Sequence, residues 1–557
     1  MLTFPLNILQ FFKFQESNSR DLINPCALMK HRIITGVILI LVVFLLFPNH
    51  TLVAQPLPEK LPWTLRNHYT FRTATGSILY CEEDAAWTLN DKTGTPVVEE
   101  VGFSVTLGSG TIIRADHLER ADAHRVNFDH ERSPGTNFNV VFPPLDGLQI
   151  NHSITSFKDR GFQMITLRVD NVSQDIIPIQ KLNPVVFQPG AVHLRDTTAK
   201  IHHQNVHVRG GSPIFDQGQQ SMLTLFHEPD REILLAMGIL PRGEARSGID
   251  FQPHGGTWMG EISCVYEPNY PLKPGESLVS DAIWLSFGDP DRDNVDLNYS
   301  WFFSTLGTNS ILAKAPPVWI AVQDNEGLDT LLRQTEAWRP YGIRHALIPG
   351  NWEGIPGSLE GATPLFPRNM AQAAKSLRDA KVSPGIIIDP LTIKSSESSG
   401  VMLSDDGQAW LNLSDQNALA LYESRIKTIL GWGFDFIVIE ASHIPDSLLV
   451  KFNMTRSQAD HLAFTHARSF AADKSILPTA SLVINPEILD WNNVGRIIKH
   501  MSTYAVTPGP VRLQADSLNG LSTEIVESMR AWPGPVELMG SPNSRNRQIY
   551  ETLFAAR

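Results

Sequence analysis

The spacing of apolar and polar residues divides the chain into two halves. From about residue 63 to residue 303, short segments with alternating apolar and polar residues are separated by Gly, Asn, Asp and Pro, and residues 162–184 form the most marked stretch. Alternation with a period of two is typical of strands that are buried on one face. Long helical periodicity is missing from this half. We therefore expect a large antiparallel β-sandwich over residues 57–310.

Beyond Ala315-Pro316-Pro317 the pattern changes to short apolar runs that alternate with helical segments, which is typical of βα units on a parallel sheet. Eight such repeats in residues 315–557 predict a (β/α)8 TIM barrel. A doubly wound open sheet is the alternative, and no glycine-rich phosphate loop supports it. The predicted strands are 318–322, 345–348, 385–388, 436–439, 480–484, 496–501, 511–513 and 536–539.

The predicted helices lie between these strands and carry apolar stripes at helical spacing. On a barrel they would form the outer ring. They are 328–338, 370–380, 417–430, 457–472 and 524–532, followed by a last helix over 545–554.

A basic segment followed by an apolar run marks the N-terminal region. Residues 30–32 are basic, residues 33–47 are fifteen residues without a charge, and Pro48 ends the run. This order predicts that residues 1–54 are an N-terminal extension and signal peptide, cut after Ala54, of a periplasmic or extracellular protein. A helix of that length reaches about 22 Å, short of the ~30 Å hydrocarbon core of a bilayer. The alternatives are an uncleaved membrane anchor through residues 33–47 and a buried core helix, which the polar, Pro-rich sequence beyond it disfavours.

The composition of the chain limits the classes of partner and cofactor that we expect. The chain has 557 residues, 42% hydrophobic and 19% charged, which is typical of a globular protein with more than one core. Its formal net charge of -12 and the lack of a basic run argue against nucleic acid as a partner. Removal of the signal leaves Cys81 and Cys264, which would form one disulfide or stay two separate buried thiols. No metal-ligand spacing is present, and we expect neither a metal nor another cofactor.

Candidate chemistry lies at the carboxyl ends of the predicted barrel strands, where barrel enzymes place their active sites. Glycoside hydrolysis needs two carboxyl groups, one to protonate the leaving oxygen and one to act as base or nucleophile. A tryptophan at such a rim would stack on the face of a sugar ring. The rim therefore predicts a carbohydrate ligand. The residues that end seven of the predicted strands are Asp324, Trp352, Asp389, Glu440, Asn485, His500 and Asp516.

Three of these carboxylates have a structural alternative. Asp389 precedes a proline and would cap the following loop. Asp324 and Asp516 stand where the N-cap of a helix is expected. For each of them, capping and function stay open as interpretations.

Glu440 is harder to explain by structure alone. It directly follows four apolar residues, and a carboxylate there is costly to hold without a partner. A functional role is therefore favoured. The alternative is an ion pair with Arg496 or Lys499 that holds the rim together.

Several segments match one family in order and spacing. Residues 167–171, with Pro178 and Leu182, look like that family's sandwich strand pair. Residues 348–352 (IPGNW) fall where the family has Asp-Asp-Gly-Trp, of which Trp352 remains, and residues 385–390 look like its third barrel strand. The chain in this respect resembles the alpha-galactosidase (melibiase-like) glycoside hydrolases.

Two further segments align with the catalytic motifs of that family. Its fourth strand ends in Lys-x-Asp, in which the aspartate is the nucleophile, and Val438-Ile439-Glu440 stands there in this chain. Residues 494–500 resemble the family's Arg-x-x-x-Asp, in which the aspartate is the acid/base. Arg496 matches the arginine, and His500 replaces the aspartate. The catalytic motifs are thus degenerate.

The resemblance implies a β-supersandwich followed by a (β/α)8 TIM barrel, and hydrolysis of a glycosidic bond. Glu440 would be the nucleophile, with Asp389, Asp516 or His500 supplying the proton. The sugar would be bound by Trp352, Arg496, Asp324 and Asn485. Two other functions stay open: a non-catalytic carbohydrate-binding protein, and a structural protein of the cell envelope.

Overall fold

The computed structural model describes residues 69–554 with breaks, the longer ones at 193–200, 216–222, 289–315, 479–510 and most of 519–535. The predicted signal peptide or anchor over residues 1–54 lies outside the described residues. Within the part of the chain that is described, no helix is both long and apolar enough to cross a membrane. The predicted domain boundaries stay a prediction.

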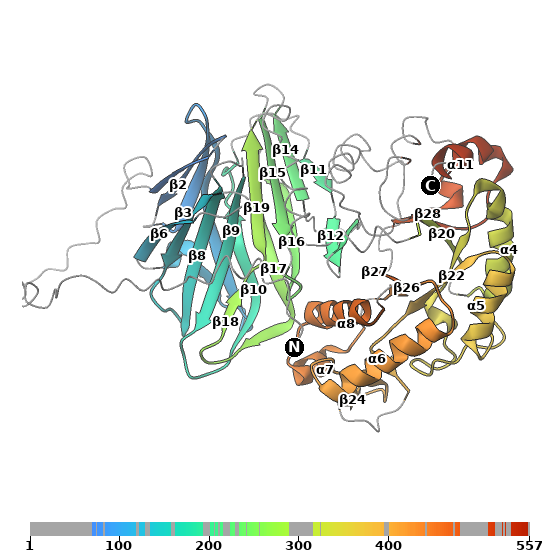
Figure 1. The fold of residues 1–557 in the computed structure, drawn as a ribbon. Coiled ribbons are helices and arrows are strands. Elements are labelled where there is room, and N and C mark those ends of the chain that lie inside the picture. The colour runs from blue at the N-terminus through green and yellow to red at the C-terminus, as the bar shows by residue number, and fades with distance from the viewer. Residues whose placement is uncertain are drawn as a thin grey trace, which may run out of the picture. The chain divides into compact units, whose positions relative to one another are not determined.

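Two antiparallel sheets make up the described part of the first half (Figure 1). The first has the strand order β1 (Tyr69–Arg72), β2 (Gly76–Cys81), β3 (Ala86–Asp91), β4 (Pro96–Leu107), β10 (Ile177–Phe187), β17 (Thr257–Leu272) and β16 (Arg246–His254), with β5 (Ile112–Arg114) paired to β4. The second has the order β11 (Ile201–Gln204), β14 (Leu223–Glu228), β15 (Ile233–Leu240), β19 (Ala282–Gly288), β9 (Phe162–Asn171), β8 (Leu148–Phe157), β7 (Gly135–Val141) and β6 (Asp122–Phe128), with β18 (Ser277–Val279) paired to β9. A hairpin of β12 (Val206–Arg209) and β13 (Ser212–Phe215) stands apart.

Aromatic side chains fill the space between the two sheets. Phe138 on β7 contacts Phe71 and Tyr80 of the first sheet, with ring centroids 4.8 and 5.3 Å apart. His152 on β8 lies 3.3 Å from the Tyr80 hydroxyl through its Nδ1 atom. These contacts join the sheets face to face, as the alternating pattern predicts.

The strand–turn–strand predicted over residues 162–184 is present, and its turn carries the chain from one sheet to the other. Asn171, at the end of β9, is buried and donates through Nδ2 to the carbonyl oxygens of Asp175 and Leu272. Its Oδ1 accepts from the backbone N–H of Ser173. An Asn side chain that replaces backbone partners in this way fixes the turn locally. β10 then begins at Ile177 in the opposite sheet.

Cys81 on β2 and Cys264 on β17 are both buried and do not form a disulfide with each other. Of the two sequence-based alternatives, separate buried thiols is the one present in the structure.

The second half is built on a curled parallel sheet of seven described strands (Figure 1). Its order is β27 (Ser475–Pro478), β26 (Phe436–Ile439), β22 (Ser383–Ile388), β21 (His345–Ile348), β20 (Val318–Ala321), β29 (Val536–Met539) and β28 (Val511–Gln514). The first strand along the chain pairs with the last, which is the neighbour relation of a barrel and not of a doubly wound sheet. Closure between β27 and β28 falls on residues 479–510, outside the described residues, so the complete eight-stranded barrel stays a prediction.

Six of the eight predicted strands are present at the expected positions. β27 (Ser475–Pro478) was not predicted and precedes the predicted fifth strand over residues 480–484. The predicted segment itself, and the predicted sixth strand 496–501, lie outside the described residues.

Side chains alternate between the two faces of this sheet. The inner face carries Trp319, Leu347, Ile387 and Val438, which pack with one another in a core of their own. The residues next to them in sequence, such as Ile320, belong to the larger core that includes the helices. This alternation is the period of two that a strand imposes.

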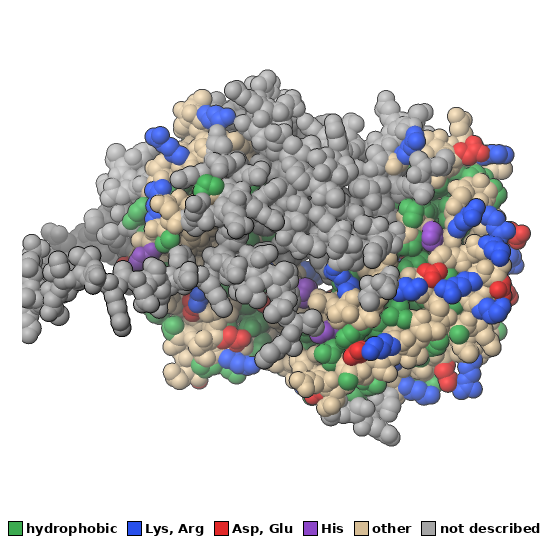
Figure 2. Space-filling model, viewed as in Figure 1, with side chains coloured by type: hydrophobic (Ala, Val, Ile, Leu, Met, Phe, Trp, Pro, Cys, Tyr) green, Lys and Arg blue, Asp and Glu red, His purple; other side chains and the backbone are tan. Residues whose placement is uncertain are grey.

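The helices begin within two residues of the predicted starts. They are α4 (Leu328–Trp338), α5 (Met370–Asp379), α6 (Gln416–Gly431), α8 (Arg456–Ala471) and α11 (Arg547–Phe554). Asn369 and Asp415 accept backbone N–H groups at the starts of α5 and α6, which explains why these helices begin there. Most of the predicted helix 524–532 lies outside the described residues. Over the helical part of the molecule, basic and acidic side chains are interspersed (Figure 2).

Two elements of the second half were not predicted. A short helix, α7 (Asp446–Phe452), follows β26. A small antiparallel sheet of β23 (Thr392–Ile393), β25 (Ala409–Leu411) and β24 (Val401–Leu403) lies in the connection from β22 to α6. Both extend connections at the carboxyl edge of the parallel sheet.

Candidate functional site

Asp389 and Glu440 leave neighbouring strands at the same level. Ile388 at the end of β22 is paired with Ile439 at the end of β26, and the Glu440 N–H donates to the Ile388 carbonyl at 2.9 Å. Since Ile387 faces the inner core, the position two residues on, Asp389, continues that face, as Glu440 does on the next strand. The two predicted carboxylates therefore emerge side by side at the carboxyl edge of the sheet.

Glu440 is half exposed and lies against the neighbouring loop. A β-carbon placed on Gly350, just beyond β21, would stand 2.9 Å from Glu440 Oε2. On the other side, His443 Nε2 is 4.0 Å from Oε1, with 72% of the histidine side chain exposed. The glycine thus leaves room for the carboxylate. The residues expected as alternative ion-pair partners, Arg496 and Lys499, lie outside the described residues.

Asp389 holds its own loop. Its Oδ1 accepts from the Leu391 N–H at 3.1 Å, and its Oδ2 accepts from the Thr392 hydroxyl. This is the capping role that the sequence offered as an alternative. A carboxylate has about four acceptor positions, so both oxygens keep capacity for a ligand. Asp389 also lines a cavity, so loop capping and ligand contact are compatible.

Trp352 is placed differently from the stacking platform that the sequence suggested. It ends the 3-10 turn η6 (Gly350–Trp352) and is 1% exposed. Its Nε1 donates to the Ile387 carbonyl at 2.7 Å, and its ring meets Trp432 edge-on at 5.8 Å. Core packing holds the ring in place as part of the cavity wall.

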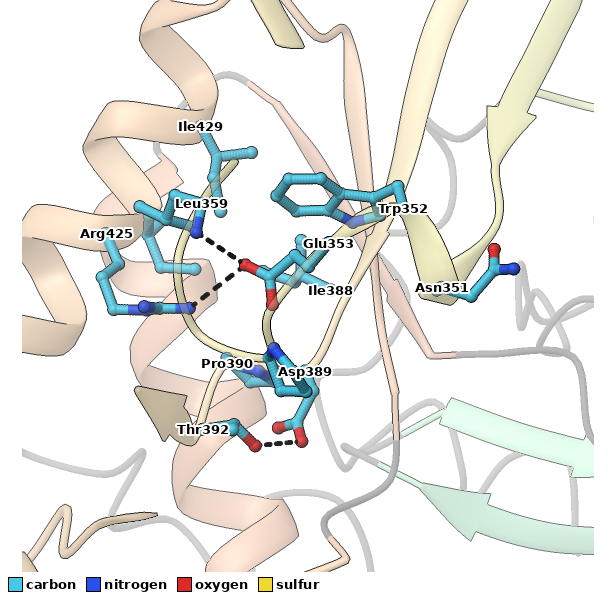
Figure 3. A pocket seen from close by; sticks show the side chains of 13 residues that line it. Asn351, Trp352, Glu353, Leu359, Ile388, Asp389, Pro390, Thr392, Arg425 and Ile429 are labelled. Atoms are coloured by element: carbon cyan, nitrogen blue, oxygen red, sulfur yellow. Dashed lines mark hydrogen bonds and ion pairs between the residues drawn. The ribbon is translucent and has the colours of Figure 1, made fainter. Parts of the chain in front are cut away.

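The cavity lies between the ends of β21 and β22 and one side of α6 (Figure 3). Its volume is about 320 Å³. That is the lower end of the range for small-molecule sites. It is lined by Gly350, Asn351, Trp352, Glu353, Pro356, Leu359, Ile388, Asp389, Pro390, Thr392, Arg425, Ile426 and Ile429.

A largely buried charge pair forms one side of this cavity. Glu353 accepts backbone N–H groups of Gly357 at 2.6 Å and Leu359 at 3.0 Å, one on each oxygen. Arg425 Nη2 lies 3.9 Å from Glu353 Oε1, and Nη1 donates to the Gly357 carbonyl at 2.7 Å. The pair fixes the loop after β21 against α6 (Figure 3).

Burial shifts both members of this pair toward their neutral forms. Desolvation raises the pKa of Glu353, and the hydrogen bond from Gly357 and the charge of Arg425 oppose it. Desolvation lowers the pKa of Arg425, opposed by the negative charges of Glu353 and Asp389. The cavity lining thus contains one cationic side chain, Arg425, and two carboxylates, Glu353 and Asp389.

Sequence reasoning missed Glu353 and Arg425. A signal for Arg425 was present, because it stands on the buried stripe of α6. A charged residue on a buried stripe needs a partner, and that partner was not visible from local sequence. The buried residues of this stripe are Ala418, Tyr422, Arg425, Ile426 and Ile429.

The other predicted site residues are not brought to this cavity by the described structure. Asp516 lies on η7 (Ala515–Leu518), directly after β28, with β29, β20 and β21 between β28 and β22 in the sheet. Among the described residues, no three His, Cys, Asp or Glu side chains are grouped so as to hold a metal ion. The residues that lie outside the described part are Asp324, Asn485, Arg496 and His500.

The strand order of the parallel sheet is that of a barrel-like fold, and solved structures of glycoside hydrolases match the chain. No protein-family model and no curated protein matches the chain. A GH36 alpha-galactosidase from Geobacillus stearothermophilus, solved with 1-deoxygalactonojirimycin, matches with a TM-score of 0.53 and 10% identity over 88% of this chain and 86% of that chain. The galactosidase domain of an alpha-galactosidase-sucrose kinase matches with a TM-score of 0.51 and 11% identity over 88% and 85%.

A form of the Geobacillus stearothermophilus enzyme solved with raffinose has a TM-score of 0.52 and 10% identity, with 88% of this chain and 86% of that chain covered. At such identity the likeness shows the fold alone. The chain has a distant GH36-like fold.

Proposed function

We propose that this protein acts on carbohydrate at the rim where Asp389 and Glu440 emerge, as a glycoside hydrolase. The observation that carries the proposal is the pairing of Ile388 with Ile439, because it brings two carboxylates to one edge of the sheet. Neighbouring strands lie about 4.8 Å apart. Carboxyl groups on adjacent strands therefore suit the retaining mechanism, which needs a separation of about 5 to 5.5 Å.

In the proposed reaction, a Glu440 oxygen attacks the anomeric carbon while the bond to the leaving oxygen breaks. Asp389 gives its proton to that oxygen. Water then attacks the glycosyl–enzyme bond, passes a proton to Asp389 and releases Glu440. Asp516 and His500 are the alternative proton donors. The ligands of the solved neighbours, raffinose and 1-deoxygalactonojirimycin, support a sugar as the substrate class.

The test is a panel of nitrophenyl glycosides with the wild type and Glu440→Gln, which keeps the shape and removes the charge. Loss of a nucleophile is expected to lower turnover at least about 100-fold. Glu423→Gln is the matched control, because Glu423 forms an exposed pair with Lys427 on α6. Full activity of Glu440→Gln would show that the nucleophile is assigned wrongly.

A second function, carbohydrate binding without turnover, is favoured by one observation. Both oxygens of Asp389 already accept hydrogen bonds from its own loop, which suits a positioning role. On this proposal the wild type cleaves none of the glycosides but binds oligosaccharides in calorimetry. The same panel and one titration therefore separate the two functions.

We also propose that the protein is exported through residues 33–47. The basic segment before them and the small residue Ala54 after them support cleavage near Gln55. N-terminal sequencing of the natural protein is the test. A chain that still carries residues 1–28 would contradict it.

A further inference from the structure

The exposed large apolar side chains of the second half lie at one edge of the parallel sheet. Among the described residues of this half, they occur only in the connections that follow β21, β22 and β26. Single exposed apolar residues are common on protein surfaces, so the informative feature is that all of them share the edge where Asp389 and Glu440 emerge. We call this group the apolar collar, and its members are Ile355, Leu365, Met402, Leu403 and Val450.

The opposite edge of the sheet carries charged residues at the comparable positions. Arg344, Lys381 and Lys474 stand just before β21, β22 and β27, and all three are exposed. Asp435, just before β26, accepts from Arg378 and Lys474. Exposed apolar side chains are therefore not a general property of the connections in this half. They belong to the edge at which the candidate site lies.

A row of side chains on the small antiparallel sheet joins Asp389 to the collar. The Thr392 hydroxyl on β23 donates to Asp389 (Figure 3). Trp410 on β25 is paired with Thr392 on one side and with Met402 of β24 on the other, so the three side chains lie on one face. Neighbouring strands are about 4.8 Å apart, which places Met402 roughly 10 Å from Thr392. Thr392 and Trp410 are buried, and Met402 is 38% exposed.

The loop after β21 brings a second collar residue to the same place. A β-carbon on Gly357 would stand 2.3 Å from the Ile393 Cα atom, so this loop lies directly against β23. Pro356 in the loop lines the cavity together with Asp389. Its neighbour Ile355 is 54% exposed. Two separate connections thus present an exposed apolar side chain close to Asp389.

The chemistry of the collar indicates its occupant. Its side chains are aliphatic or thioether groups, which offer no strong hydrogen bond to a sugar hydroxyl. They gain free energy by removing apolar surface from water, so they favour an apolar ligand. Interfaces with other proteins are typically anchored by Trp, Tyr or Arg, and the collar contains none of these. The group that meets this edge in the proposed reaction is the leaving group, because Asp389 protonates its oxygen there.

We propose that the apolar collar binds an apolar leaving group of the substrate, so that the protein acts on the glycoside of an alkyl or lipid alcohol. The inference deepens the proposed function and rests on it for the reaction. The group departs as the free alcohol, with the proton from Asp389 on its oxygen. Ile355 and Met402 are the specificity-determining residues. Such a substrate differs from the raffinose ligand of one solved neighbour, which is sugar throughout.

The experiment compares methyl and octyl glycosides of galactose and glucose, both anomers of each, below the micelle concentration. An extended octyl chain spans on the order of 9 Å, enough to reach from the rim toward Met402. Affinity is measured by calorimetry on the full chain carrying Glu440→Gln, so that turnover does not interfere. We expect an octyl glycoside to bind at least about tenfold more tightly than its methyl counterpart, because its chain is buried.

Adding Ile355→Ser and Met402→Ser is expected to reduce this advantage to less than about threefold and to leave the methyl glycoside unchanged. The matched control adds Val172→Ser and Ile176→Ser, two exposed apolar residues of the sandwich outside the collar. The control is expected to keep the full advantage of the octyl chain.

Three results would overturn the inference. The first is equal affinity for octyl and methyl glycosides, or no binding of any of them; the nitrophenyl panel with the wild type then decides the proposed function separately. The second is an equal loss in the collar variant and in the control. The third is a wild-type dimer in light scattering that Met402→Ser dissociates, because β24 then pairs with a second copy. A wild type that cleaves no glycoside while the octyl advantage persists contradicts the proposed hydrolysis and supports the collar as a binding surface.

Discussion

Asp281 in the first half of the chain and Arg425 in the second are both almost fully buried, yet their surroundings differ. Asp281 is 2% exposed, and its oxygens accept from the Arg242 N–H at 2.6 Å and the Ser247 hydroxyl at 2.5 Å. Both of its oxygens are thus occupied by the protein itself. Arg425 keeps one buried donor and lines a cavity.

The comparison shows that burial of a charge does not by itself mark a binding site. What separates the two places is the balance between donors and acceptors. Where the protein supplies every partner, the group serves the fold, and where one partner is missing, a buried donor costs free energy. The following predictions test this difference, from the largest expected effect to the smallest.

The largest effect is expected from Arg425→Leu, which leaves Glu353 buried with its backbone donors but without its counter-charge. Breaking a buried ion pair from one side costs about 3 to 5 kcal/mol in the free energy of unfolding. Urea unfolding measures it. The double variant Arg425→Leu, Glu353→Leu is expected to recover part of the loss. Arg368→Leu, which breaks an exposed pair with Glu360, is the control and is expected to change little. An equal loss of unfolding free energy in Arg425→Leu and in Arg368→Leu would contradict a stabilising role of the buried pair.

The next effect concerns His152 in the core of the first half. Burial lowers its pKa from 6.5 to about 4. The unfolded chain therefore binds a proton at a higher pH than the folded one. The resulting stability is complete above pH 6.5 and is lost as the pH falls toward 4, on the order of 3 kcal/mol in the free energy of unfolding. His152→Phe, in contact with the ring of Phe103, is expected to remove this dependence in urea titrations at several pH values. If the unfolding free energy of His152→Phe changes with pH between 4 and 6.5 as it does in the wild type, His152 is not the source of this dependence.

Asp281 is expected to act in the opposite sense over much of the same pH range. Burial raises its pKa from 3.8 to about 6, so the folded chain binds the proton more tightly than the unfolded chain. This group destabilises the fold increasingly as the pH rises from about 4 to 6, by on the order of 2 to 3 kcal/mol. Asp281→Asn is expected to abolish that decline. In the wild-type protein the pH dependences of His152 and Asp281 partly cancel, so the unfolding free energies of the two variants are compared with each other as well as with wild type. If the unfolding free energies of His152→Phe and Asp281→Asn change with pH in the same direction, the two groups do not act in opposite senses.

Much of the framework could be predicted from the sequence because local patterns carry it. The starts of α5 and α6 follow from apolar stripes preceded by Asn369 and Asp415, and β20 and β26 follow from short continuous apolar runs. β27 was not predicted, because Ser475–Pro478 is a short apolar run that ends in a proline and so gives a weak strand signal. Its pairing with β26 depends on the packing of the whole sheet, which a local pattern does not contain.

The site was predictable only in part, for a related physical reason. Asp389 and Glu440 follow strand ends, so the rule for parallel sheets places them together without further information. Arg425 and Glu353 belong to a helix and a loop that are distant in sequence, and only packing brings them into contact. Trp352 was expected to stack on a sugar ring at the rim, and the structure shows that its Nε1 donates to a backbone carbonyl of the sheet. A tertiary partner decides the role of each of these three residues.

The smallest expected effect on stability, and the sharpest test of the rim, comes from Gly350→Ala. The added β-carbon would stand 2.9 Å from Glu440 Oε2, closer than real contacts allow, and the carboxylate is the end of a flexible side chain that can turn away. The fold should therefore lose no more than about 0.5 kcal/mol. Displacing a reacting group by a fraction of an ångström to 1 Å lowers turnover about tenfold to 100-fold.

Gly354→Ala is the matched control, because the nearest atom to its β-carbon is 3.5 Å away, an ordinary contact. The measurement is kcat/KM on the glycoside that the wild type cleaves best, or affinity for the oligosaccharide it binds if it cleaves none. If Gly350→Ala and Gly354→Ala behave alike, Glu440 does not act at the position where the structure holds it, and the rim loses the residue on which the proposed function depends.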